Sequence, residues 1–493
     1  MIAKSEKSKK YTAAVLALIY WAITFVTEKK IFDVSRIPER MFTYVSIKIL
    51  TLLTLFALFY LLLSFVEGIK TKNAAFYSVL YAIPYAAVLI FRRMWCGAYP
   101  FIGDEQNIFW EACSFSNLEG MFHYITTYFH MVAMQLWPDG MSMIVFKHIV
   151  CGLAVGYSIY RINRLYKNKW GFLVYLIFFV PYVIDISWSV HRMPMYGPLY
   201  LFFASVLYCD YKENAELNMK KLLLLALVCA VLTQWRVEGI CLLFFGPVFI
   251  LLAYHVKADK KQILKILAVC LAMQVFVWFP QKLETRALGE GYAVSRTMYF
   301  YNYVLPNMVR KGLDREKNAE DLAVIEKYVK MEDIDALNED LGESVYYDEF
   351  IHVHTSSSYN SLVISVEQAA EYEGAIRHII LRNPLLYVRT QLGAFLFIST
   401  SYGLNTLRGV MYTITGNLIV PALIMIAAWV VMLIRKRWFE FLMLTSPLCH
   451  AAITTALLPA AYFKYYYMQF ILAYAIVVLV IAGLWNRRKR VAA

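Results

Sequence analysis

Long apolar runs recur along the whole chain, and short basic clusters separate them. Hydrophobic residues make up 60% of the 493 residues, and the mean hydropathy is +0.53, whereas a soluble domain is roughly half apolar. So many apolar residues cannot all be buried in one water-soluble core. The pattern predicts an all-α polytopic membrane protein.

The net charge of +13 is distributed in short clusters between the apolar runs. In a soluble protein this charge would suggest nucleic-acid binding, but here the clusters lie where the positive-inside bias places cytoplasmic loops. We therefore expect no nucleic-acid partner. Lysines within residues 1–10 and the basic residues of 487–490 predict that both termini are cytoplasmic. The expected location is the plasma or inner membrane.

The apolar runs divide into about twelve predicted transmembrane helices when the strongly basic short loops are assigned to the cytoplasmic side. Under this assignment only two basic stretches, Lys29 to Arg40 and Arg92-Arg93, fall on the outer side. The predicted spans are about residues 11–27, 44–66, 74–93, 141–160, 171–189, 196–209, two halves of 222–255, 266–280, 411–434, 438–458 and 467–485.

Two of these regions have unusual lengths. The run 196–209 would form a helix of only about 21 Å, short of the roughly 30 Å hydrocarbon core, so protein must cover it or it must border an aqueous cavity. The run 222–255 is too long for one helix and carries Arg236 and Glu238 near its middle. Charges at mid-span cost about 2.5 to 3.5 kcal/mol each, so we expect two short helices that turn at residues 235–239 on the outer side.

The chain divides into three predicted regions. Residues 1–280 form an N-terminal membrane domain whose first outer loop covers 94–140, and residues 401–493 form the C-terminal membrane helices. Residues 281–400 form a small mixed extracytoplasmic domain with interfacial helices. Within it, residues 281–392 carry 12 Lys and Arg against 18 Asp and Glu, so the sign of the charge changes.

Local patterns predict the secondary structure of the outer regions. Residues 316–341 have helical periodicity, 350–365 have the β-branched and polar alternation of a strand or loop, and helix returns near 367–389. Residues 118–138 are aromatic and Met-rich with scattered polar residues. We expect this stretch to form a helix that lies along the membrane interface.

Charged residues at the outer surface are the candidates for chemistry. A carboxylate beside several cations suits a reaction in which a hydroxyl loses its proton while a phosphate leaves. The carboxylate would act as a general base or hold a divalent metal ion, which is the one cofactor considered. The candidates are Asp104, Glu105, Glu111, His191, Arg192, Arg236, Glu238, Lys464 and Tyr465.

Each candidate also has an ordinary structural interpretation. Asp104 and Glu105 fit a solvated loop. Arg236 and Glu238 fit an ion pair at a helix turn, and Lys464 fits a lysine whose stem lies in lipid while its charge reaches water. The argument for a common site is that all of them fall on one predicted side of the membrane.

Histidine pairs offer a second possible kind of site. His352 and His354 would share one face of a strand, but a zinc site needs more ligands and no third is evident. His123 and His130 are seven residues apart and share a helix face, for which an interfacial aromatic face is the favoured interpretation. No metal site is assigned.

Four short motifs occur at these positions. Gly103-Asp104-Glu105 opens the first large outer loop, and His191-Arg192-Met193-Pro194-Met195-Tyr196 precedes a short span. Arg236-Val237-Glu238-Gly239 separates two short helices, and Lys464-Tyr465 begins the last span. Together they resemble the GT-C superfamily, integral membrane glycosyltransferases that use polyprenyl-phosphate-linked sugars, over most of residues 100–485.

The resemblance implies an inverting transferase that moves a sugar from a polyprenyl-phosphate carrier to an acceptor on the outer side of the membrane, in the assembly of a cell-envelope glycan. Asp104, or else Glu105, would activate the acceptor, and Lys464 would contact the lipid phosphate with Arg236 and Arg192. The implied partners are the polyprenyl-phosphate-linked sugar, a glycan, lipid or protein acceptor, and membrane lipids.

Two other functions fit the same sequence. A polysaccharide polymerase or ligase of the O-antigen type also has about twelve spans and outer arginines, but it uses lipid pyrophosphate-linked chains. A transporter or flippase of lipid-linked glycans is the third interpretation. Against the transporter stand the lack of repeat symmetry and the gathering of charges at one surface rather than at the bilayer midplane.

Overall fold

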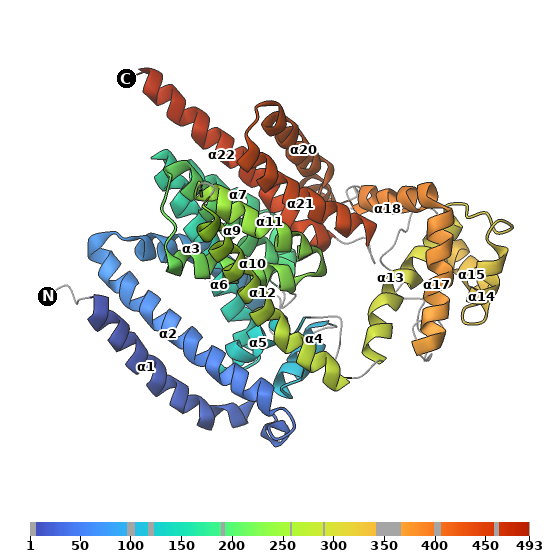
Figure 1. The fold of residues 1–493 in the computed structure, drawn as a ribbon, viewed down its shortest axis with the longest axis horizontal. Coiled ribbons are helices and arrows are strands. Elements are labelled where there is room, and N and C mark those ends of the chain that lie inside the picture. Colours follow the sequence, from blue (N-terminus) through green and yellow to red (C-terminus); the bar gives the residue numbers. More distant parts are fainter. Residues whose placement is uncertain are drawn as a thin grey trace.

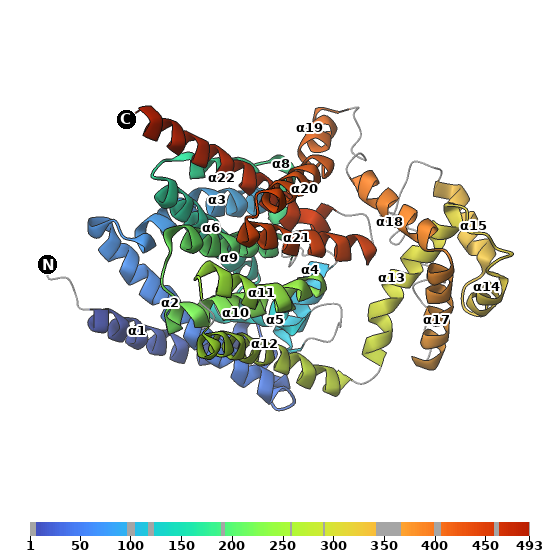
Figure 2. The same cartoon turned by 45° about the horizontal axis from the view of Figure 1, so that its top comes forward.

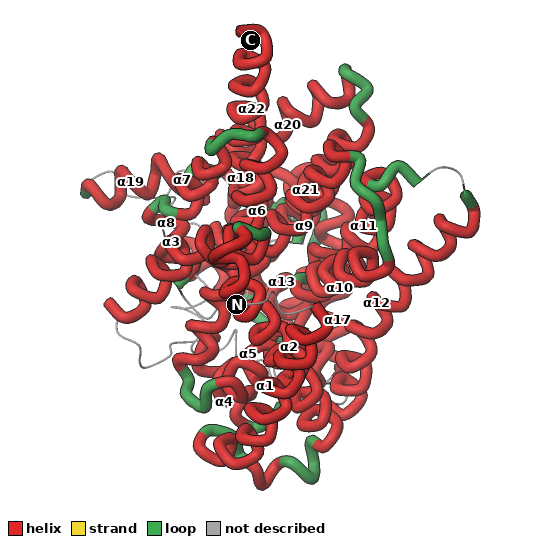
Figure 3. The backbone as a smooth tube through the Cα atoms, turned by 90° about the vertical axis from the view of Figure 1, so that its left-hand side faces the viewer, coloured by secondary structure: helices red, strands yellow, loops and turns green. Residues whose placement is uncertain are grey.

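A computed structural model describes the chain in residues 6–95, 104–116, 123–188, 193–256, 259–288, 291–341, 366–398, 406–457 and 463–492. The protein is 86% helical, and the described residues contain no strand (Figure 3). The all-α class predicted from the sequence is therefore confirmed.

The helices follow one another with short connections in most of the described chain. In order they are α1 (Glu6–Thr27), α2 (Met41–Thr71), α3 (Ala74–Trp95), α4 (Asp104–Cys113), α5 (Tyr124–Leu136), α6 (Met141–Tyr166), η3 (Trp170–Leu173), α7 (Val174–Phe178), α8 (Pro181–Ser187), α9 (Met193–Glu213), α10 (Met219–Trp235), η4 (Val237–Ile240), α11 (Cys241–Ala253), α12 (Lys260–Leu288), α13 (Gly291–Arg310), α14 (Ala319–Glu326), α15 (Met331–Leu341), α17 (Val366–Arg382), α18 (Pro384–Ile398), α19 (Leu407–Thr415), α20 (Ile419–Ile434), α21 (Trp438–Ala456), η5 (Phe463–Tyr466) and α22 (Tyr467–Ala492).

Seven helical segments in the described chain are long and apolar enough to cross a membrane, and a pair bent by 67°, Trp170–Phe178 with Pro181–Ser187, could form an eighth span. These segments indicate a multi-pass membrane protein. The predicted count of about twelve also needs α9, α10, α11 and α21. Of these, α10 and α11 are too short to pass the same test, and α9 and α21 are less apolar.

The centre of the bundle contains α3, α6, α9 and α22, while α1 and α2 form a curved pair at one edge (Figure 1). Helix α6 approaches α3 closely through Gly152 and Gly156, which are four residues apart. A Cβ atom on Gly156 would lie 2.4 Å from the carbonyl oxygen of Ser78. Small residues at this spacing let two membrane helices touch backbone to backbone.

Helix α9 is longer than the fourteen residues expected from its apolar run. It has 21 residues and ends in a polar segment, where Asp210 pairs with Arg161 at 2.7 Å and with Lys221 at 3.0 Å. These ion pairs let the helix continue through charged residues, so the apolar run underestimated its length. The prediction that protein covers this helix is confirmed, because most of its side chains are buried.

The predicted break in 222–255 is confirmed. Helix α10 ends at Trp235, the short η4 follows, and α11 begins at Cys241. The turn is tight at Gly239, where a Cβ atom would lie 2.4 Å from the carbonyl oxygen of Leu232. Any larger residue there would push the two helices apart.

Helix α5 differs from the expected interfacial helix. Ten of its 13 residues are buried, so α5 is enclosed by the surrounding helices rather than exposed along one face. Its contacts include α2, α4, α6 and α12. One of the scattered polar residues that suggested an interface, Gln135, instead has polar partners inside the protein: its side-chain oxygen accepts from Lys48 Nζ at 2.9 Å.

Helices α13, α14, α15, α17 and α18 form a lobe beside the membrane bundle (Figures 1 and 2). The predicted helix 316–341 is divided into α14 and α15, and the predicted helix 367–389 is broken between α17 and α18, where Pro384 begins the second helix. Arg382 on α17 pairs with Asp321 on α14 at 2.8 Å. Residues 350–365, for which a strand or loop was predicted, lie outside the described residues.

Candidate functional site

The acidic run lies at the start of α4. Asp104 and Glu105 are the first two residues of this helix, where the helix dipole favours negative charge. Their side chains lie outside the described part of the structure, so the choice between them stays a prediction. Glu111, two residues before the end of α4, is buried with 6% of its surface exposed.

His191 and Arg192 also lie outside the described residues. The described chain resumes at Met193, the first residue of α9. Tyr196, the last residue of the same motif, is buried in the centre of the bundle. The motif therefore leads directly into the helix on which the next part of the site is built.

Arg236 and Glu238 form a two-contact ion pair in the turn between α10 and α11. The Arg236 Nη2 atom is 2.5 Å from Glu238 Oε1, and Arg236 Nε is 3.0 Å from Glu238 Oε2. Only 5% of Arg236 is exposed. The pairing matches the structural interpretation of these two residues, and it also holds the guanidinium in one orientation.

Tyr465 brings the two predicted phosphate-binding cations together. The Arg236 guanidinium carbon is 5.5 Å from the centre of the Tyr465 ring, and Lys464 Nζ is 5.8 Å from the same ring. Both distances are within the range of cation–π attraction. Four of the predicted site residues, Arg236, Glu238, Lys464 and Tyr465, thus meet although the two pairs are more than two hundred residues apart in sequence.

Three polar residues that sequence reasoning did not assign to the site border this pair. The His450 ring is 5.5 Å from that of Tyr196, and His450 Nδ1 is 2.7 Å from Gln469 Nε2. Both His450 and Tyr196 interact electrostatically with Arg236 and Glu238. In the sequence, His450 could have been noticed as a histidine inside the apolar run 438–458.

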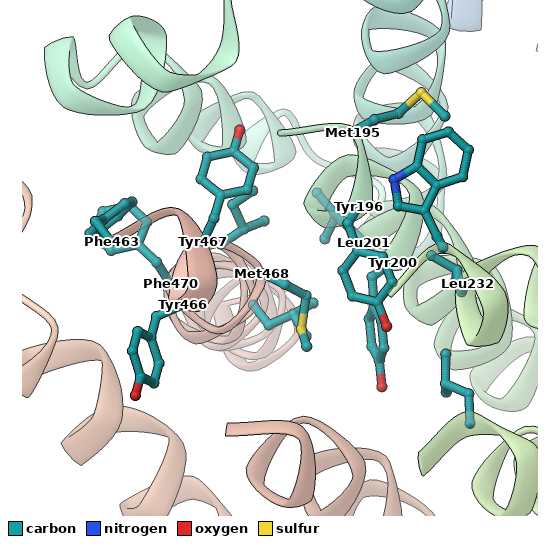
Figure 4. Packing of buried hydrophobic residues seen from close by; sticks show 14 of the residues in the cluster. Met195, Tyr196, Tyr200, Leu201, Leu232, Phe463, Tyr466, Tyr467, Met468 and Phe470 are labelled. Carbon is teal, nitrogen blue, oxygen red and sulfur yellow. The ribbon is translucent and has the colours of Figure 1, made fainter. Parts of the chain in front are cut away.

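These three residues carry buried polar atoms without hydrogen-bond partners among the described residues: the Tyr196 hydroxyl, His450 Nε2 and Gln469 Oε1. Neighbouring tyrosines are satisfied instead. Tyr200 donates to Ser446 at 3.0 Å, and Tyr466 and Tyr467, whose hydroxyls point to opposite sides of their helix (Figure 4), bond Thr455 and Ser187. Buried polar groups are usually paired, so the unsatisfied set marks a place for a polar ligand.

A hollow of about 390 Å³ borders Arg236 on the side of α12. Its wall includes Trp235, Trp278, Gln234 and Gln274. Gln274 donates to Thr233 at 3.0 Å, while its Oε1 atom is buried without a partner among the described residues. Aromatic rings with a few amide groups are a wall suited to a small polar ligand.

A second group of buried cations lies where α3, α5, α6 and α8 meet. Lys147 donates to the carbonyl oxygen of Ser187 at 2.9 Å, and the Arg93 guanidinium carbon is 4.9 Å from the Trp188 ring. His130 and His148 are buried beside Lys147. None of these residues was assigned to the site from the sequence. Lys147 and His148 are enclosed within an otherwise apolar stretch, Arg93 was noted only as part of a basic stretch, and His130 only as part of a histidine pair.

Among the residues that the structure describes, no group of three or more His, Cys, Asp or Glu residues could hold a metal ion. The side chains of Asp104 and Glu105, and both His352 and His354, fall outside this search. A metal role for the acidic run therefore stays a prediction.

No known protein family, characterised protein or solved structure matches this chain. Function is therefore inferred from the chemistry of the site. That site combines a fixed guanidinium, a nearby lysine, several tyrosines and a histidine at one end of the helical bundle. Such a set can hold a phosphate and stabilise the charge that a leaving phosphate develops. Participation of the carboxylates at the start of α4 stays a prediction.

Proposed function

We propose that this protein is a membrane glycosyltransferase that moves a sugar from a polyprenyl-phosphate carrier to an acceptor on the outer side of the membrane. The observation that supports it most is the meeting of Arg236 and Lys464 at the Tyr465 ring. Both cations were predicted from separate motifs to bind the same lipid phosphate. A single anionic ligand explains why both cations lie beside the same aromatic ring.

In this proposal Arg236 and Lys464 bind the phosphate of the donor. Glu238 holds the Arg236 guanidinium through two contacts, which lowers the entropy lost when the phosphate binds. The predicted contribution of His191 and Arg192 comes from the chain just before α9. The hollow lined by Trp235, Trp278 and the two glutamines offers space beside Arg236 for the sugar.

The reaction needs a base for the acceptor hydroxyl. Asp104 or Glu105 takes its proton, the acceptor oxygen attacks the anomeric carbon, and the bond from that carbon to the phosphate oxygen breaks. The electron pair leaves on the polyprenyl phosphate, where Arg236 and Lys464 stabilise it. Attack opposite the leaving phosphate inverts the configuration of the sugar.

Substitution of the two carboxylates tests this assignment. We expect Asp104→Asn combined with Glu105→Gln to lower the transfer rate by roughly 10²- to 10⁴-fold, because a general base contributes about that much. The measurement is the release of polyprenyl phosphate from radiolabelled polyprenyl-phosphate hexoses in vesicles that contain the purified protein. The melting temperature of the variant should stay unchanged.

Gln106→Ala is the matched control, since Gln106 is the next residue of α4 and its side chain is exposed. Full transfer by the double variant would contradict the roles given to Asp104 and Glu105. Turnover only with oligosaccharides on a lipid pyrophosphate, and none with monosaccharide carriers, would instead identify a polymerase or ligase of the O-antigen type.

A further inference from the structure

A second cavity, of about 500 Å³, lies at the end of the bundle opposite to Arg236. Helices α6, α9, α20, α21 and α22 surround it, and its wall is mainly apolar, with Leu201, Met432, Met443 and Leu479 among the lining residues. This volume falls in the range of roughly 300 to 1,000 Å³ that ligand sites occupy. None of the residues proposed to act in sugar transfer lines it.

The mouth of this cavity carries a small ionic cluster. Lys212 Nζ is 2.5 Å from Glu440 Oε1, and Arg437 pairs with the same carboxylate oxygen. Two cations thus share one carboxylate, which leaves one positive charge in excess. Arg435 and Lys436 are exposed in the adjoining turn, so the surroundings of the mouth are also basic.

Several uncharged polar groups lie in the same part of the cavity. The hydroxyls of Tyr166 and Tyr208 are 3.0 Å apart, and both residues line the wall together with Asn486. Farther in, the wall is mainly apolar, and the hydroxyls of Tyr200 and Ser205 bond Ser446 and Ser158. The cavity therefore has a charged, hydrogen-bonding opening and an apolar interior. These two parts match an amphipathic molecule, which has a polar headgroup and an apolar chain.

The opening belongs to the predicted cytoplasmic side. It lies between the C-terminal end of α9, the start of α21 and the later part of α22, which leads to the basic residues 487–490. Basic pockets between transmembrane helices on that side are a known setting for anionic lipid headgroups. A water-soluble ligand would gain little from the apolar interior.

We propose that this cavity binds an anionic phospholipid of the cytoplasmic leaflet, with its phosphate at Lys212 and Arg437 and one acyl chain in the apolar interior. The site is independent of the proposed sugar transfer. The acyl chain enters the cavity from the equally apolar bilayer, so its burial gains little free energy. The excess cation therefore selects an anionic headgroup over a neutral one.

The rival occupant is an isoprenoid chain. The inner wall of the cavity includes Tyr200 and Pro447, which are one helical turn from Tyr196 and His450 of the candidate site. A carrier lipid whose tail reached back from that site could enter the same space. The two occupants differ in where they place the phosphate, since only a phospholipid of the near leaflet would contact Lys212 and Arg437.

Lipid titration of the purified full-length protein tests the proposal. After removal of bound lipid, native mass spectrometry would count the binding of phosphatidylglycerol, phosphatidylcholine and undecaprenyl phosphate. We expect phosphatidylglycerol to bind this cavity more tightly than phosphatidylcholine. The variant Lys212→Gln with Arg437→Gln and Glu440→Gln should weaken it about fivefold, which corresponds to one net charge near the membrane surface, and should leave phosphatidylcholine unchanged.

A second variant tests the chain-binding part separately. A Cβ atom on Gly483 would lie 3.5 Å from the Tyr166 ring, so Gly483→Leu can be accommodated there and would fill the cavity beside it. Gly483→Leu should weaken the binding of both phospholipids. Arg435→Gln removes an exposed charge outside the cavity and should change the affinity for either phospholipid by no more than about twofold.

Three results would overturn the proposal. They are equal affinity for the two phospholipids, binding of undecaprenyl phosphate that is tighter than that of phosphatidylglycerol and is weakened by the same cavity variants, and phospholipid binding that neither variant changes. Thermal melting of each variant shows whether it folds. If the triple variant does not fold, the same comparison with Gly483→Leu and with Lys212→Gln alone decides the outcome. Loss of sugar transfer with lipid binding intact would instead count only against the proposed enzyme.

Discussion

At the scale of single residues, the charges inside the bundle are almost all engaged by a partner from another helix. Lys48 and Glu28 are the clearest pair: each has about 5% of its side chain exposed, and Lys48 Nζ is 2.6 Å from Glu28 Oε2. Thr24, Tyr44 and Gln135 complete the set of hydrogen bonds. Such a satisfied group costs less to bury than an isolated charge.

The groups beside Arg236 are among the buried polar atoms without a hydrogen-bond partner in the described residues, and Tyr196 allows a direct test. Its buried hydroxyl has no partner among the described residues, so we expect Tyr196→Phe to fold with unchanged or higher stability. If that hydroxyl serves a ligand, the transfer rate should fall by about tenfold, the effect of one hydrogen bond of roughly 1.4 kcal/mol. Melting temperature and transfer rate, measured together, separate the two effects.

Tyr200→Phe is the matched control for this experiment. Its hydroxyl donates to Ser446 at 3.0 Å, so its loss should lower the free energy of unfolding by about 1 kcal/mol with little change in transfer. A Tyr196→Phe variant that loses stability but keeps full activity would show that the hydroxyl has only a structural role.

At the scale of helices, close packing depends on a few small side chains. Gly152 and Gly156 let α6 lie directly against α3, where Ser78 and Ala82 face them. This contact positions the end of α3, with Arg93, beside Lys147 on α6. A glycine pair four residues apart was visible in the sequence, but only the structure shows which helix it faces.

Gly156→Leu should destabilise the bundle by at least about 1 to 3 kcal/mol, because the added side chain has to displace backbone atoms of α3. The measurement is thermal unfolding of the protein in detergent. Gly374→Ala is the control: it is also a helical glycine, but a Cβ atom there meets nothing within 4 Å. It should raise stability slightly, since alanine favours helix by up to about 1 kcal/mol.

At the scale of the whole molecule, charged residues form two layers at opposite ends of the helices. One layer contains Arg161, Asp210 and Lys221, and the other contains Arg236 and Glu238. Seven spans would place the termini on opposite sides of the membrane, whereas eight spans, with the bent pair included, place them on the same side. The predicted cytoplasmic location of both termini thus requires the bent pair, or twelve spans, to cross.

Cysteine labelling tests this orientation. We expect Glu320→Cys, on the exposed surface of α14, to react with a membrane-impermeant maleimide in intact cells. Lys169→Cys, in the basic connection after α6, should react only after the cells are permeabilised. A Cys96→Ser background removes the one cysteine outside the described residues, while the other seven are buried or half-buried. The reverse pattern would place the candidate site on the cytoplasmic side.

Much of the architecture follows from the sequence alone. Apolar runs predicted most helices, because each such helix satisfies its backbone hydrogen bonds locally and needs only apolar side chains toward lipid. The break at residues 235–239 followed from the cost of two charges at mid-span. Arg236 and Glu238 were also chosen from sequence, as charges too costly to place at mid-span without a reason, and Lys464 and Tyr465 as a basic-Tyr pair at the predicted outer end of the last span.

Only the tertiary structure decided which side chains meet. The contacts of Tyr465 with Arg236, and of His450 with Tyr196, depend on how α9, α10, α21 and α22 pack, and no local pattern carries that information. The same holds for α5, where Gln135 suggested an interface but forms hydrogen bonds with Lys48 and Glu28 of other elements. Helix formation is set by neighbours in sequence, whereas pairing of buried polar groups is set by neighbours in space.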